Sequence, residues 1–147
     1  MTSAHRTSIA ADPDLVLRMK ENGSDIVMLP LDESAGVGCY SEASVSIPKQ
    51  AITDGMSASF LHESSARTFE LKKSSISDAV LSVFLGIASN GGWDWMVRYF
   101  ETAPHLSGAR RLKVKVYEQT GEETRAWEVS GSAPEVVEAL RVLRNGT

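Results

Sequence analysis

Few residues of this chain are suited to nucleophilic, acid–base or metal chemistry, and they lie far apart in the sequence. There is one cysteine, Cys39, and there are three histidines, His5, His62 and His105. Cys39 is a candidate nucleophile only if a histidine lies beside it in space. His62 precedes a glutamate, as at the start of a zinc-protease helix, but no second histidine follows at the spacing that such a site requires. We therefore expect no metal, no cofactor and no catalytic residue.

One alternative gives Cys39 or His62 a functional role. A small enzyme or ligand-binding domain with an apolar pocket would use Cys39 or His62, and it requires that they converge on a cleft. A protein that is not an enzyme is the better interpretation, because the sequence contains no motif for catalysis or phosphate binding.

A run of basic side chains is the second feature that could bind a ligand. It consists of Arg110, Arg111, Lys113 and Lys115. On a strand the last three would share one face, since successive side chains alternate. This gives another alternative, anion or nucleic-acid binding through Arg110–Lys115. A solvated face whose cations pair with Glu118 and Glu128 across a hairpin is the simpler interpretation, and the net charge of −4 argues against a nucleic-acid partner.

An aromatic pair is the third feature. A helix is predicted from Trp93 to Thr102, because it gathers four large apolar side chains into one stripe. Trp95 and Tyr99 lie on the other side of this helix, four residues apart. They pack against another part of the chain, or against a second subunit or partner, where Trp and Tyr are enriched. The candidate partner-binding residues are therefore Trp95, Tyr99, Arg111, Lys113 and Lys115.

The elements that must position these residues are clearest in the C-terminal half. Ser77–Ser89 is apolar around most of a helical wheel, which predicts a helix buried on several sides. Leu112–Tyr117 and Thr124–Val129 alternate apolar and polar residues and predict a hairpin. Ser132–Glu135 is a capping box with a proline in the first turn, so a last helix should begin there.

In the N-terminal half we expect strands and a tail. Residues 1–12 are small and polar and predict a flexible tail. Alternating residues then predict five strands, the first two and the last two forming hairpins. These strands are Leu15–Lys20, Ile26–Leu31, Ala43–Ile47, Met56–Leu61 and Arg67–Lys72.

Together these elements predict an α+β fold. We expect two or three mostly antiparallel β-hairpins, about seven short strands in all, packed with three helices. The 147 residues, 42% of them hydrophobic, suit one domain over residues 13–147. A single cysteine, no apolar leader and no apolar run long enough to span a membrane predict a cytoplasmic protein.

The order of elements over residues 76–147 resembles the effector-associated constant component family of bacterial conflict systems. The resemblance rests on the predicted apolar helix, the tryptophan-bearing helix, the basic hairpin and the final capped helix. It implies a non-catalytic adaptor associated with an effector in bacterial defence. Our leading hypothesis is a protein–protein interaction module that self-associates as a homo-oligomer through its central helices. It rests on the surplus apolar surface of Ala79–Ile87 and on the Trp95 and Tyr99 pair.

Overall fold

The computed structural model describes residues 5–70, 78–86, 91–103, 106, 110–120 and 123–144. Its strands are β1 (His5–Ile9), β2 (Ile26–Met28), β3 (Asp32–Ser34), β4 (Val37–Ser41), β5 (Ala58–Phe60), β6 (Arg67–Glu70), β7 (Asp78–Leu85), β8 (Arg111–Thr120) and β9 (Glu123–Gly131). Its helices are α1 (Pro13–Asn22), α2 (Ile47–Thr53), α3 (Gly92–Thr102) and α5 (Ala133–Arg144). The α+β class is thus confirmed, with nine strands and four α-helices in the described residues.

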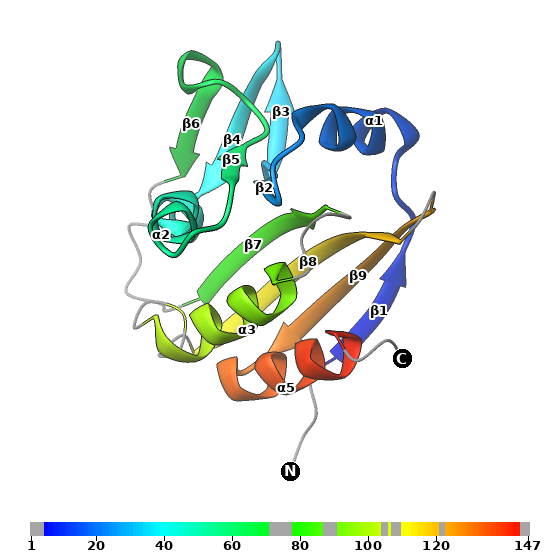
Figure 1. Cartoon of the computed structure of the whole chain (residues 1–147), viewed down its shortest axis with the longest axis vertical. Coiled ribbons are helices and arrows are strands. Elements are labelled where there is room, and N and C mark those ends of the chain that lie inside the picture. The colour runs from blue at the N-terminus through cyan, green and yellow to red at the C-terminus, as the bar shows by residue number, and fades with distance from the viewer. Residues whose placement is uncertain are drawn as a thin grey trace.

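The strands form two mixed sheets. The large sheet has the order β1-β9-β8-β7-β2-β5, and the small sheet has the order β3-β4-β6 (Figure 1). Side chains of α2, α3 and α5 share the main hydrophobic core with one face of the large sheet. On the other face, α1 packs over Val27, Phe84 and Tyr117 in a second, smaller core. Farther along β8 on this face, Lys113 and Lys115 are exposed.

The C-terminal half contains the elements that the sequence predicts best. β8 and β9 form the expected hairpin, in which Leu112, Val114 and Val116 are fully buried. The capping box of α5 is present, because the Ser132 backbone N–H donates to Glu135 at 2.9 Å and the Glu135 N–H donates to the Ser132 hydroxyl at 3.4 Å. Helix α3 begins within a residue of the predicted Trp93.

The apolar segment predicted as a helix is instead the strand β7. It pairs with β8 in parallel and with β2 antiparallel, so it is interior to the sheet. A strand covered on both faces is apolar on both faces, and this pattern cannot be told from a buried helix by periodicity alone. Residue 77 and residues 87–89 of the predicted helix lie outside the described residues.

The first predicted strand, Leu15–Lys20, is wrong, because these residues belong to α1. Pro13 occupies the first turn of this helix, and Gly23 ends it with a left-handed φ of 77°. The apparent alternation misleads, since Leu17 is 56% exposed whereas Met19 is completely buried. Residues 5–9, expected within a tail, form β1 and pair antiparallel with β9.

The remaining N-terminal predictions fail mainly in strand pairing. Ala43–Ile47 is not a strand but a 3-10 turn and the start of α2, where Pro48 lies in the first turn. Strands β5 and β6 form where expected but in different sheets, β5 in parallel with β2 and β6 in parallel with β4. Neither predicted N-terminal hairpin exists, and residues 71–72 lie outside the described residues.

Candidate functional site

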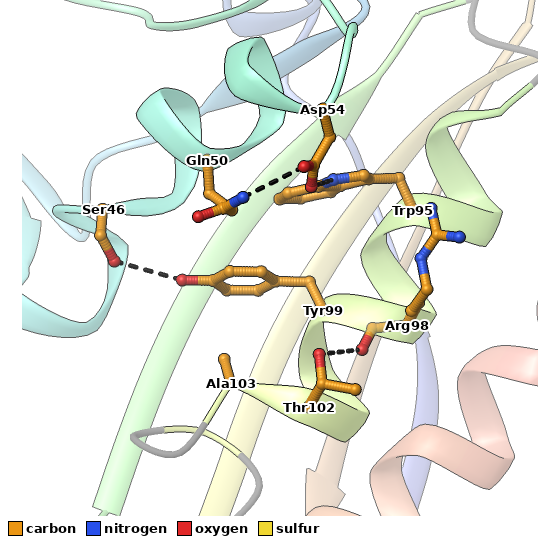
Figure 2. A pocket seen from close by; sticks show the side chains of 8 residues that line it. All are labelled: Ser46, Gln50, Asp54, Trp95, Arg98, Tyr99, Thr102 and Ala103. Carbon is orange, nitrogen blue, oxygen red and sulfur yellow. Dashed lines mark hydrogen bonds between the residues drawn. The ribbon is translucent and has the colours of Figure 1, made fainter.

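The aromatic pair lies where α2 meets α3 (Figure 2). Its two rings are stacked, with centroids 4.9 Å apart and an interplanar angle of 16°. Trp95 Nε1 donates a hydrogen bond of 2.8 Å to the Asp54 carboxylate, and the Tyr99 and Ser46 hydroxyls share one of 3.1 Å. A groove of about 500 Å³, the interhelical groove, is lined by Ser46, Gln50, Asp54, Trp95, Arg98, Tyr99, Thr102 and Ala103.

These contacts support the within-chain alternative for the aromatic pair. Trp95 is only 3% exposed, and its acceptor Asp54 also receives a hydrogen bond of 3.1 Å from Gln50. The pair therefore ties α3 to α2. A partner-binding role for Trp95 and Tyr99 stays a prediction, but the surplus apolar surface that motivated it is smaller, because Ala79–Leu85 lies inside the sheet.

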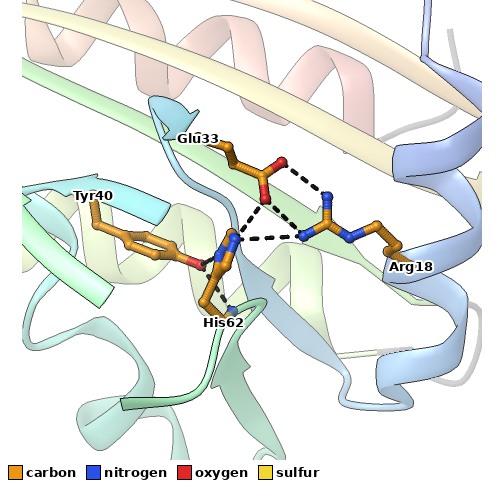
Figure 3. A network of polar contacts seen from close by, with 4 residues as sticks. All are labelled: Arg18, Glu33, Tyr40 and His62. Atoms are coloured by element: carbon orange, nitrogen blue, oxygen red, sulfur yellow. Dashed lines mark hydrogen bonds and ion pairs between the residues drawn. The ribbon is translucent and has the colours of Figure 1, made fainter. Parts of the chain in front are cut away.

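Four polar residues, Arg18, Glu33, Tyr40 and His62, form a network between α1 and the small sheet (Figure 3). The Arg18 guanidinium donates two hydrogen bonds of 2.8 Å to the Glu33 carboxylate, and that carboxylate lies 2.6 Å from His62 Nε2. The Tyr40 hydroxyl accepts from the His62 backbone N–H at 3.0 Å and lies 2.8 Å from His62 Nδ1. This geometry fits an imidazole whose proton is on Nε2, facing Glu33.

The network shifts the pKa values of two of its members, and its centre is closed to solvent. The hydrogen bonds from Arg18 lower the pKa of Glu33 to about 2, against partial burial and with help from His62. Burial raises the pKa of Tyr40. Tyr40 is completely buried and His62 is 8% exposed. Such a chain of hydrogen bonds can transfer a proton. Because it connects α1 with the small sheet, we favour a structural role, in which it holds α1 against the small sheet.

The pocket alternative for Cys39 and His62 stays a prediction. Cys39 lies half-buried on β4, opposite Asp32 of β3. Neither residue belongs to the lining of the three grooves found in the described part of the chain. The sequence singled out His62 but not its partners, because Arg18, Glu33 and Tyr40 come from separate elements and no spacing connects them.

Arg111, Lys113 and Lys115 are exposed on one face of β8, which agrees with the predicted solvated face. Lys113 pairs with Glu128 on β9 at 2.9 Å. The other expected partner, Glu118, lies on the opposite face and instead accepts a hydrogen bond from Trp93 Nε1. Beside the lysines is a groove of about 470 Å³, the sheet-face groove. It is lined by Leu15, Leu29, Pro30, Leu31, Asp32, Glu33, Val80, Leu81, Ser82, Lys113, Lys115 and Tyr117.

Strand β1 is an edge of the large sheet. All five residues pair in register with β9 on one side, from His5 opposite Ser130 to Ile9 opposite Ala126. No described strand pairs with the other side. His5–Ser8 are exposed. The outer backbone N–H and C=O groups of β1 are therefore available to another strand.

Among the described residues no three His, Cys, Asp or Glu side chains gather as metal ligands. None of the described helices combines the length and apolar character needed to cross a membrane.

Comparisons with protein-family models, curated proteins and solved structures find no match to this chain. The class that the fold defines is an α+β protein with a six-stranded mixed sheet, and its function must be argued from geometry.

Proposed function

We propose that this protein is a non-catalytic protein–protein interaction module that self-associates through strand β1. The observation that carries the proposal is the outer edge of β1, which pairs with no strand of the described residues. A second copy of the chain can add its own β1 to this edge by main-chain hydrogen bonds, as in β-strand addition.

The β1 edge lacks the features that usually prevent such pairing. Natural edge strands are protected by short length, proline, bulges or several charges. β1 has five residues paired without a bulge, no proline and one full charge, on Arg6. The other edge strands of the two sheets are shorter: β5 and β3 have three residues each, and β6 has four.

The sequence of β1 is also self-complementary. In an antiparallel pair centred on Thr7, each Thr7 faces the other, Arg6 faces Ser8 of the other copy, and His5 faces Ile9. Directly opposed residues therefore carry no like charges, which would destabilise the pair. The result is a two-fold, isologous interface that joins the two large sheets.

The resemblance to the effector-associated constant component family favours an adaptor role for this self-associating module. The basic hairpin, the tryptophan-bearing helix and the Ser132-capped helix of that resemblance are present. Residues 78–85 form a strand where the resemblance rested on a helix. A self-associating module without chemistry of its own suits an adaptor, because it places two copies of whatever it carries side by side.

Opposite charges placed at Ser8 test the interface. Ser8→Arg sets an arginine against Arg6 of the other copy at two places and should weaken the dimer about 2- to 30-fold. Ser8→Glu sets a carboxylate against each Arg6 and should strengthen it by a similar factor. Size-exclusion chromatography with light scattering over a range of concentrations measures both.

The matched control is Ser65→Arg, which adds the same charge at an exposed serine outside β1. It should leave self-association unchanged. A wild-type protein that stays monomeric at high micromolar concentration would contradict the proposal, as would equal dissociation constants for Ser8→Arg and Ser65→Arg.

A further inference from the structure

Two buried hydroxyls in the sheet-face groove have no partner within the described chain. Ser82 is 7% exposed and Tyr117 is 8% exposed, and both line the groove. Neither hydroxyl forms a hydrogen bond with a described residue, whereas most buried polar groups in proteins are satisfied. Both hydroxyls are therefore available to a polar group of a ligand.

The same groove contains a lysine that has no ion pair within the described chain. Lys115 lies directly opposite Glu128 in the β8–β9 register, but Glu128 forms its ion pair with Lys113. One carboxylate cannot neutralise two lysines. Among the described residues Lys115 forms no ion pair, and it is the neighbour of Ser82 across the β7–β8 pair. A cation, a serine hydroxyl and a tyrosine hydroxyl thus line one side of the groove.

The groove also has an apolar wall. It is formed by Leu15 of α1 and by Leu29 and Leu31, which follow β2. Leu31 is 38% exposed. Two acids also line the groove, but the charge of Glu33 is balanced by Arg18, so Asp32 is the only acid of the lining without an ion pair in the described chain.

We propose that the sheet-face groove binds a small amphipathic carboxylate. Its charged head lies between Lys115 and the hydroxyls of Ser82 and Tyr117, and its hydrocarbon body packs against Leu15, Leu29 and Leu31. A volume of about 470 Å³ is within the range of small-molecule sites. The apolar wall favours a ligand with a hydrocarbon chain over a bare inorganic anion.

Isothermal calorimetry with hexanoate, octanoate and decanoate tests the ligand class. Affinity should rise roughly fourfold for each methylene that the groove buries. Inorganic phosphate and decyltrimethylammonium should bind much more weakly than decanoate. Equal affinity for the cationic amphiphile would overturn the proposal, because the contact would then be non-specific adsorption. Equal affinity for phosphate would overturn the role of the hydrocarbon chain.

Three conservative variants test the head group. Lys115→Met keeps the length of the side chain and should weaken decanoate binding about 10-fold, whereas Lys49→Met, at an exposed site on α2, should not. Ser82→Ala and Tyr117→Phe should each weaken binding about 3- to 10-fold. The ligand-free forms of these two variants should melt at the same temperature as wild type or higher, because each loses a buried unpaired hydroxyl.

That combination separates a binding role from a structural one. Hydroxyls that stabilise the fold would lower the melting temperature when removed, and that result would overturn the proposal. Asp32→Asn should leave decanoate affinity unchanged or raise it. A loss of affinity in Asp32→Asn would mean that a cation-bearing ligand occupies the groove, and it would also overturn the assignment.

Discussion

At the residue scale, Gly38 gives His62 its place. A Cβ at position 38 would lie 2.4 Å from His62 Nδ1, where no side chain fits. Gly38→Ala must therefore push out an imidazole that Tyr40 and Glu33 hold from both ends. We expect a loss of about 1–3 kcal/mol in the free energy of unfolding, measured with urea.

Gly91→Ala is the control for this substitution. The nearest atom to its added Cβ is the Met56 sulfur at 3.8 Å, an ordinary contact. It should cost about 0.5 kcal/mol or less. Equal costs for the two alanines would show that His62 moves aside freely.

The carboxylate of Glu33 gives the protein a pH dependence with a defined direction. Its pKa is about 2 in the folded chain, below the usual value, so its stabilising effect is complete above about pH 5 and is lost as the pH falls toward 2. Because Glu33 is 35% exposed and screened by solvent, we expect this loss to be about 1–2 kcal/mol.

Urea unfolding of Glu33→Gln at several pH values measures this contribution. The variant should be less stable than wild type at pH 7, and the two curves should converge near pH 2. Glu63→Gln removes an exposed carboxylate that forms no ion pair among the described residues, and it should parallel wild type. A constant difference between Glu33→Gln and wild type over the whole range would exclude the ion pair as its cause.

Some candidate site residues could be predicted from the sequence and others could not. Arg111, Lys113 and Lys115 follow from alternation along a single strand, which is local information. Tyr117 follows from the same alternation, because it is the next residue of β8 on that face. Ser82 joins them only because β7 lies parallel to β8, and a parallel register between distant segments leaves no local signal.

At the element scale, the junction of α2 and α3 depends on one carboxylate. Asp54→Ala removes the acceptor of the Trp95 indole N–H and leaves a buried donor without a partner. We expect a cost of about 1–3 kcal/mol in the free energy of unfolding. Thr53→Ala, next to it and exposed, breaks only a bond to the Lys49 carbonyl and should cost about 0.5 kcal/mol or less. A similar small cost for both variants would mean that the indole finds another acceptor.

Elements with local start and stop signals are predictable in this chain, and those defined by their neighbours are not. The helix α5 is announced by Ser132 and Glu135, and the β8–β9 hairpin by alternation on both sides of a short turn. The strand β7 has no local start or stop signal. It is apolar on both faces because it lies between β2 and β8 and is covered by side chains on both faces of the sheet. The helix α1 shows the converse error, because Leu15, Leu17 and Met19 also alternate by chance.

At the scale of the whole molecule, the sheet is unequally stable across its width. The strands β7 and β8 are paired on both sides, whereas β1 pairs with β9 and with no other strand of the described residues. Amide hydrogen exchange should therefore be slowest in β7 and β8 and fast in β1. If β1 forms the interface between copies, its protection should increase with protein concentration while that of β5 stays constant. Concentration-independent exchange in β1 would argue against that interface.

The pairing of β1 with β9 also has a consequence for synthesis on the ribosome. The segment His5–Ile9 is made more than a hundred residues before its partner, Glu123–Gly131. At about 5–20 residues per second this interval is roughly 6–25 s. During it β1 has no intramolecular partner, whereas the β1 segments of neighbouring nascent chains on one messenger RNA are close to each other. Assembly of two copies can then begin before either chain is complete.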